Sequence, residues 1–340
     1  MKNLNVLYEM PNSFLEVSHR DIKKVFDKPT LIHLSGKKSS ALFVSILLHG
    51  NEYSGLEIMQ DILEKYKTTN GYKLPRDLWI FVGNVDAAEL GLRLLDSQVD
   101  FNRAWPGTPD ADNDTASLIQ EVIDTISKEE LFAAVDLHNN TGQNPPYGCI
   151  SNVNEQNKYL CTLFNHIAMV FKMPKGVSTM AFDNLCPAIT LECSTPGNIP
   201  AKEKAFALVD ALMHMDHFPQ KQVAEHDLQL VQNSATVKIN EDVTFCFEED
   251  IHSDEETDVV VVKNFDHHNF TDLEKGEVFA FTKVQKPFIV TSPEGEDITD
   301  MILQNDNGAI SLKYALMPAM ISMDKKIVLQ DCLCYLLEDY

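Results

Sequence analysis

The chain has 340 residues, which is long for a single hydrophobic core, so two domains are expected. Hydrophobic residues make up 44% of it, as in ordinary soluble globular proteins. The 28 Lys and Arg residues against 51 Asp and Glu residues give a formal net charge of −23. This balance argues against nucleic acids and anionic membrane surfaces as partners, because both require a basic surface.

The sequence also lacks the signals of export and membrane insertion. Residues 1–17 contain no apolar run long enough for a signal peptide, and no run reaches the ~18 residues that span a bilayer. The seven cysteines are odd in number and follow no CxxC or zinc-finger spacing, which is typical of reduced thiols. We therefore expect a cytoplasmic protein without a membrane partner.

Residues 41–215 alternate between apolar runs and helical patterns, which predicts an α/β domain. Fully apolar short strands indicate a sheet that helices cover on both faces. A segment rich in Gly, Pro and Asn at 141–149 is predicted to be a loop. The predicted strands lie at 41–48, 79–85, 131–137 and 188–191, and the predicted helices at 54–67, 115–131, 154–171 and 201–218.

The pattern changes after about residue 220 to short segments rich in β-branched and aromatic residues, separated by acidic turns such as 248–258. These features predict a smaller β domain. Residues 219–227 are the best candidate for a linker. We therefore expect an α/β domain over 1–218 and a β domain over 225–340.

Three of the predicted strands lead into residues suited to one catalytic site. His49 and Glu52 follow the first run at a spacing that lets both side chains face one cation. His138 and Glu192 close two later runs, and ligand sites gather at the carboxyl ends of strands in α/β sheets. A lone His at a strand end is more often a core or loop residue. Two His and one Glu together, however, are the zinc ligands of metallo-carboxypeptidases.

Four segments in this order resemble a known family. LLHGNEYSG, DFNRAWPG, DLHNNTG and TLEC are similar to segments of the succinylglutamate desuccinylase/aspartoacylase family, a branch of the zinc carboxypeptidase superfamily. The resemblance covers about residues 40–200 and continues weakly at 272–281. It implies a three-layer α/β/α domain with a mixed sheet, plus a smaller C-terminal all-β domain that borders the active-site cleft.

The resemblance also implies the catalytic machinery. His49, Glu52 and His138 would bind one Zn²⁺ per chain, and the ion would polarise the scissile carbonyl and activate water. Glu192 would be the general base that takes the proton of that water and returns it to the leaving amine. Family members often associate, so a homo-oligomer is an open alternative.

The substrate-binding residues match the family less completely. Asn102 and Arg103 correspond to its substrate-binding pair, since an Arg fork suits a carboxylate. Arg93 resembles the Arg that stabilises the oxyanion, although its distance from Asn102 is two residues longer, and a surface Arg is the alternative. Members that act on succinylglutamate or N-acetylaspartate carry another Arg before the catalytic Glu. Here residues 176–190 contain neither Arg nor Lys, and Lys175 is the nearest cation.

The resulting hypothesis is a zinc-dependent hydrolase that cleaves the amide bond of a small N-acyl amino acid. The missing Arg favours a substrate with a single carboxylate over the two acidic substrates of the family name. One alternative is a metallo-carboxypeptidase that acts on small peptides. Another is a non-catalytic zinc-binding or ligand-binding relative.

Overall fold

The computed structural model describes residues 4–96, 98–248 and 257–340 and divides the chain into two compact units. The first unit comprises residues 1–139 and 146–229, and the second comprises 140–145 and 230–340. Residues 140–145, predicted as part of a loop of the first domain, thus group with the second unit. Most of the acidic turn expected at 248–258 lies outside the described residues.

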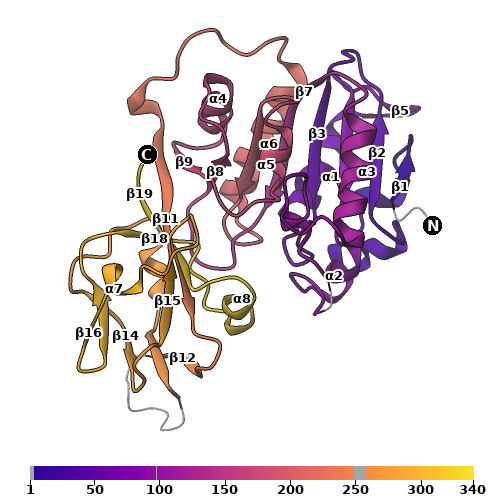
Figure 1. Cartoon of the computed structure of the whole chain (residues 1–340). Helices are drawn as coiled ribbons and strands as arrows, with labels where there is room; N and C mark the ends of the chain where they lie inside the picture. Colours follow the sequence, from indigo (N-terminus) through magenta and orange to yellow (C-terminus); the bar gives the residue numbers. More distant parts are fainter. Residues whose placement is uncertain (1–3, 97, 249–256) are drawn as a thin grey trace. The chain divides into compact units, whose positions relative to one another are not determined.

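The first unit is built on a mixed sheet (Figure 1). Its central strands β6, β3, β7 and β10 run parallel, whereas β2 and β8 are antiparallel to the neighbours on either side of this centre. The carboxyl ends of the central strands therefore meet at one edge. In spatial order the strands are β1 (Asn5–Leu7), β2 (Thr30–Leu34), β6 (Leu78–Val82), β3 (Ala41–Ile46), β7 (Leu131–His138), β10 (Ala188–Glu192), β8 (Tyr147–Ile150) and β9 (Ile167–Val170).

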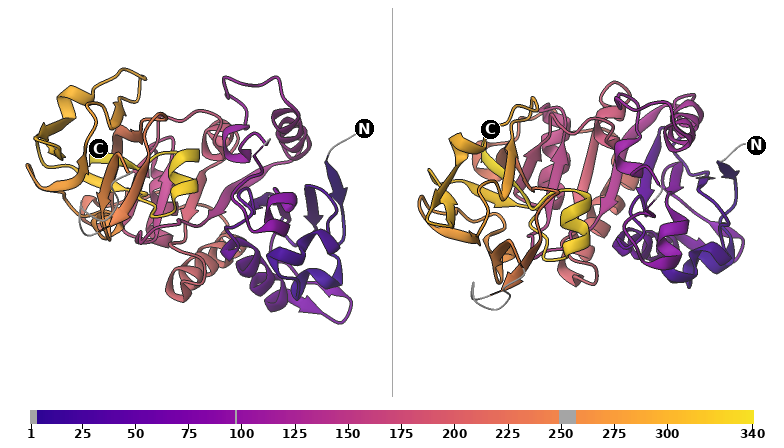
Figure 2. Two further views of the ribbon diagram at one scale, coloured as in Figure 1. Left: turned by 90° about the horizontal axis from the view of Figure 1, so that it is seen from below. Right: turned by 60° about the horizontal axis from the view of Figure 1, so that its bottom comes forward.

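Helices cover both faces of this sheet. Helices α1 (Ser54–Tyr66) and α4 (Glu155–Phe164) both pack on α6 (Ile199–His214). On the opposite face lie α3 (Asp114–Ile126) and α5 (Ser178–Phe182), which share a core with Phe43 and Trp105. Figure 2 shows α1 and α6 together on one side of the sheet and α3 on the other. The prediction of a three-layer α/β/α arrangement is confirmed.

One predicted helix is wrong in part. The pattern at 154–171 predicts a single helix, but α4 ends at Phe164 and residues Ile167–Val170 form strand β9, which pairs with β8. A short apolar run such as IAMV fits a buried helix turn and a buried strand equally well by periodicity. The predicted loop at 141–149 likewise runs into β8 at Tyr147.

The second unit is mainly β structure (Figure 1). Its five-stranded sheet has the order β12 (Phe245–Glu248), β13 (Val259–Val262), β14 (Val278–Thr282), β17 (Ala309–Leu312) and β16 (Leu303–Asp306). Strand β11 (Gln229–Ile239) pairs with β15 (Phe288–Thr291) and β19 (Cys334–Asp339), and β19 pairs with β18 (Met317–Ala319). Both groups of strands contribute to one apolar core.

The remaining elements are short. Among them are α2 (Val85–Leu90), the hairpin of β4 (Lys67–Thr68) and β5 (Gly71–Tyr72), α7 (Thr299–Ile302) and α8 (Lys325–Gln330). Within the described ranges, none of the helices combines the length and the apolarity that a membrane crossing requires. The prediction of a further β-rich part after the α/β domain is confirmed.

Candidate active site

The loop after β3 is fixed in place by its neighbours. Leu47 has a φ of 54°, so the chain turns sharply as the strand ends. The Leu47 carbonyl accepts a hydrogen bond from Asn84 N at 2.6 Å, and Gly50 N donates to the Arg93 carbonyl at 3.0 Å. These bonds tie the loop to the segments on both sides of α2 and hold His49 at the carboxyl edge of the sheet.

Gly50 is packed so closely on α2 that a side chain cannot fit. A Cβ atom there would lie 2.1 Å from the backbone nitrogen of Ala88, which cannot move aside as a side chain can. We expect Gly50→Ala to lower the free energy of unfolding by about 1–3 kcal/mol in urea titrations. Gly55→Ala is the matched control, because the nearest backbone atom to its Cβ, the Leu137 carbonyl oxygen, would be 3.3 Å away instead of 2.1 Å. An equal or larger loss at Gly55 would contradict this account.

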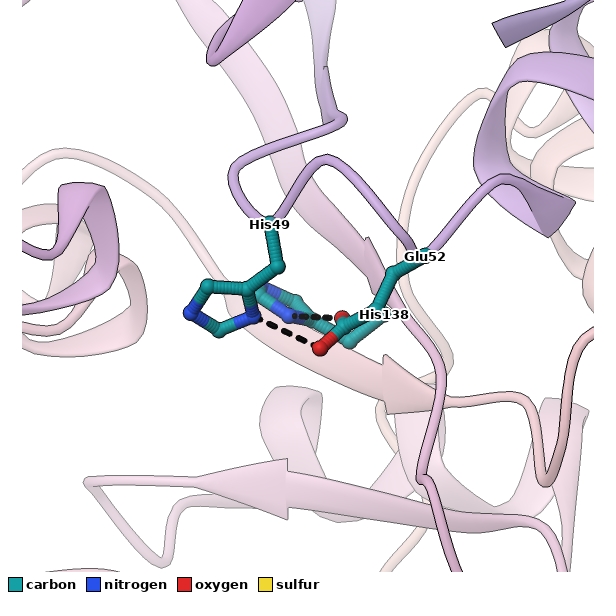
Figure 3. A group of neighbouring side chains, drawn as sticks. All are labelled: His49, Glu52 and His138. Atoms are coloured by element: carbon teal, nitrogen blue, oxygen red, sulfur yellow. Dashed lines mark hydrogen bonds and ion pairs between the residues drawn. The ribbon is translucent and has the colours of Figure 1, made fainter. Parts of the chain in front are cut away.

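His49, Glu52 and His138 converge at the carboxyl edge of the sheet, and we call them the His49 group (Figure 3). His49 Nδ1 lies 2.7 Å from Glu52 Oε1, and His138 Nδ1 lies 2.8 Å from Glu52 Oε2. All three residues are buried, and their ligand atoms lie within 4.8 Å of one another. Two imidazoles and a carboxylate in this arrangement can hold a metal ion.

The far nitrogens of both rings are held by carboxylates. His49 Nε2 lies 3.0 Å from Asp100 Oδ1, and His138 Nε2 lies 2.9 Å from Asp136 Oδ2. Such carboxylate–histidine pairs orient metal-binding imidazoles and fix which nitrogen faces the ion. Here they leave both Nδ1 atoms facing Glu52.

Asp136 is itself held by two hydroxyl groups. Ser45 Oγ on β3 donates to Asp136 Oδ1 at 2.7 Å, and Ser178 Oγ, the first residue of α5, donates to Asp136 Oδ2 at 2.8 Å. Three elements therefore position the carboxylate that orients His138. This network leaves little freedom for the imidazole to rotate.

The charges of the His49 group favour a cation at its centre. Burial alone would raise the pKa of Glu52, but the two histidines outweigh it and hold that pKa below its ordinary value. Burial lowers the pKa of His138, yet Asp136 and Glu52 raise it well above the usual range. A divalent ion bound between these donors would replace the protons that the imidazoles share with Glu52.

Glu192 lies beside the His49 group. It ends β10 and is the direct neighbour of His138 in the parallel register of β10 and β7. Its side chain is 7% exposed, and burial raises its pKa to about 7. A carboxyl group that titrates near neutral pH can both accept and return a proton.

Arg93 also reaches the His49 group. Its Nη1 lies 3.3 Å from Glu52 Oε1, and its Nη2 lies 3.3 Å from Asp100 Oδ2. The side chain is only 12% exposed, so the alternative of a surface arginine is wrong. The guanidinium places a positive charge next to the candidate metal-binding residues.

Asn102 and Arg103 lie in the short helical turn Phe101–Arg103 that follows Asp100. Asn102 N donates to Asp100 Oδ1 at 2.7 Å, so the turn is tied to the carboxylate that holds His49. Among the described residues, the buried side-chain oxygen of Asn102 has no hydrogen-bond partner. A buried acceptor without a partner is unfavourable, so a donor from a ligand would stabilise it.

Residues near Lys175 pack against this turn. Trp105 N donates to the carbonyl of Gly176 at 3.0 Å, and a Cβ atom on Gly176 would lie 2.3 Å from the Arg103 carbonyl oxygen. Lys175 is exposed and adjoins this contact. Lys175 is distant from Arg103 in the sequence, but the segment that carries Lys175 contacts the turn that carries Arg103.

Comparison with known proteins agrees with these features. Residues 39–203 match the family described as succinylglutamate desuccinylase/aspartoacylase catalytic domain. This part of the chain, just under half of its length, is similar to that family. Every residue of the His49 group lies in the matched range, as do Glu192, Arg93, Asn102 and Arg103. No curated protein sequence matches the chain.

Solved structures of the family share the fold. A succinylglutamate desuccinylase from Chromobacterium violaceum is 13% identical, with a TM-score of 0.56 over 89% of this chain and 85% of that chain. A succinylglutamate desuccinylase/aspartoacylase from Rhodobacter sphaeroides is 12% identical, with a TM-score of 0.59 over 91% and 88%. Murine aminoacylase 3 is 15% identical, with a TM-score of 0.52 over 89% and 96%.

Sequence reasoning overlooked two carboxylates at this family site, Asp100 and Asp136. Both lie inside the segments that carry the resemblance, DFNR and DLHN. Asp136 precedes His138 by two residues on one strand, and residues at this spacing share a face of the sheet. That spacing was a usable signal for Asp136, whereas the contact of Asp100 with His49 depends on the path of a loop.

Proposed function

We propose that this protein is a zinc-dependent hydrolase that cleaves the amide bond of a small N-acyl amino acid. The observation that carries the proposal is the buried His49 group with Glu192 beside it in register. The similarity of residues 39–203 to the family supports the reaction class, and the solved structures with this fold are named as desuccinylases and an aminoacylase.

The residues present fit a zinc ion. The imidazoles of His49 and His138 and the carboxylate of Glu52 form the donor set of catalytic zinc, and Asp100 and Asp136 orient the two rings. Bound zinc would polarise the scissile carbonyl and lower the pKa of water toward ~7.

Glu192 handles the protons of the reaction. Its carboxylate accepts a proton from the attacking water as the new C–O bond forms. It returns this proton to the amide nitrogen as the C–N bond breaks, so the products are a carboxylic acid and an amine. A pKa of about 7 suits both directions of this transfer at neutral pH.

The arginines supply positive charge at two places. Arg93, next to Glu52, stabilises the negative charge that develops on the carbonyl oxygen. Arg103 binds the carboxylate of the amino acid through its guanidinium fork, and the free oxygen of Asn102 accepts a bond from the substrate.

The test of this function is amine release by the zinc-loaded protein from a panel of acetyl and succinyl amino acids with Asp, Glu or neutral side chains. Because residues 176–190 provide no cation, we expect neutral side chains to be preferred. Dipeptides with a free carboxylate serve as the comparison, and faster cleavage of them would favour a carboxypeptidase. Absence of activity on the whole panel would favour a non-catalytic relative.

A variant of Lys175 tests the expected preference for neutral side chains. If the substrate carries one carboxylate, Lys175→Met should change kcat/KM for neutral substrates less than about threefold, because Arg103 already binds that group. Lys172→Met is a matched control, since Lys172 is also exposed and lies on the same segment. A preference for acidic side chains that is lost only in Lys175→Met would show that Lys175 binds a second carboxylate.

A further inference from the structure

His33, Asp77 and Glu129 form a second group of metal-ligating side chains, separate from the His49 group. We propose that these three residues, called the His33 group, bind a second divalent transition-metal ion of the Zn²⁺ type. An imidazole with two carboxylates suits such ions. This proposal goes beyond the function proposed above, which needs one ion.

The His33 group lies at the opposite end of the parallel strands from the His49 group. Asp77 directly precedes β6, and its carbonyl accepts a hydrogen bond from Leu42 N at the start of β3. His49 follows the other end of β3. The two groups are therefore separated by about the length of that strand, roughly 15–20 Å.

The spacing of the ligand atoms suits a bound ion. His33 Nε2 lies 3.6 Å from Asp77 Oδ2 and 3.9 Å from Glu129 Oε2. These distances exceed a hydrogen bond. They are close to the ligand–ligand separation of about 3.3–3.6 Å that metal–ligand bonds of 2.0–2.2 Å produce around a tetrahedral ion.

Each ligand is held by a further contact. The His33 ring stacks on Trp79, with ring centroids 4.4 Å apart. Trp79 Nε1 donates to Glu129 Oε2 at 3.1 Å, and Gly36 N donates to Asp77 Oδ1 at 2.6 Å, which leaves Asp77 Oδ2 facing the imidazole. Contacts of this kind orient the ligands of metal sites.

The imidazole of His33 faces two carboxylates without forming a hydrogen bond to either. His33 Nε2 is buried and has no hydrogen-bond partner among the described residues, which is unfavourable for a polar atom. Lys38 lies next to the group, because its backbone carbonyl accepts a hydrogen bond from Asp77 N. Its ammonium group, however, pairs with Asp216 at 2.6 Å. A cation held by all three side chains would satisfy the nitrogen and neutralise the two carboxylates.

The stacking of His33 on Trp79 provides a direct readout. The chain has two tryptophans and nine tyrosines, so Trp105→Phe leaves Trp79 as the single tryptophan, and excitation at a wavelength that tyrosine does not absorb reports on it alone. We would load the full-length variant with one equivalent of Zn²⁺ to fill the His49 group and then titrate Co²⁺, a fluorescence quencher that binds such sites more weakly than Zn²⁺. We expect saturable quenching of more than half of the Trp79 emission, with one Co²⁺ bound per chain.

Glu129→Gln in the same background should weaken Co²⁺ binding at least tenfold, and the Gln oxygen can still accept the Trp79 hydrogen bond. His33→Gln should abolish the quenching. Glu130→Gln is the matched control, since it removes one negative charge from the adjacent, exposed position and should leave the titration unchanged. No saturable quenching in the parent, or equal quenching in the Glu129 and Glu130 variants, would overturn the proposal, whatever the activity of the enzyme.

Discussion

Replacing Glu192 by glutamine should lower kcat for amide hydrolysis by about 10²–10⁴-fold. Glutamine has nearly the same shape but cannot accept the proton of the attacking water. The substitution leaves every residue of the His49 group in place, so zinc should still bind there. The expected result is an inactive protein that retains its zinc.

The measurement pairs steady-state kinetics on the best substrate of the panel with zinc analysis of the same samples. Glu203→Gln, on the exposed side of α6, is a control for the loss of one carboxylate and should keep full activity. Activity retained in Glu192→Gln would remove Glu192 as the general base. Loss of both zinc and activity would instead give it a structural role in the metal site.

The strands around Glu192 could be predicted from the sequence because local apolar patterns determine them. The apolar runs that contain β3, β7 and β10 each lead into a polar side chain. Parallel strands covered by helices bring their carboxyl ends to one edge. The register that sets Glu192 beside His138 follows from that arrangement.

The two carboxylates that orient the imidazoles differ in how far they could be predicted. Asp136 lies two residues before His138 on one strand, a spacing that indicates contact, whereas no local pattern links Asp100 to His49. Asp100 meets His49 across 51 residues of chain, and the contact depends on how the loop after Arg93 is folded. Such contacts arise from tertiary packing rather than from local periodicity.

The His33 group was still harder to predict from the sequence, because it also depends on tertiary packing. Strand β2, which carries His33, precedes the first strand that the pattern predicts, and it runs antiparallel to β6. Asp77 and Glu129 lie in the connections before β6 and β7. The three residues lie in separate segments, so their contact could be predicted only from the order of the strands in the sheet.

Replacing Glu52 by glutamine should remove zinc from the His49 group, abolish activity and destabilise the metal-free protein by about 3–5 kcal/mol. Glu52 is buried and lies within hydrogen-bonding distance of both His49 and His138, while Asn139 N donates to it at 3.0 Å. Because the two imidazoles hold the pKa of Glu52 low, the carboxylate is charged in the folded state. Glutamine would leave buried positive charge without its central anion.

Urea unfolding of the metal-free proteins measures this loss, and zinc analysis measures binding. Glu57→Gln in the first turn of α1, shortly after Glu52 in the chain, is the matched control, because Glu57 is 39% exposed and pairs with Lys202 at 3.4 Å. An exposed pair of this kind contributes at most about 1 kcal/mol. Equal stability losses in the two variants would contradict a buried ionic role for Glu52. Full zinc binding in Glu52→Gln would contradict the assignment of Glu52 as a zinc ligand, since two histidines alone should bind zinc more weakly than all three residues.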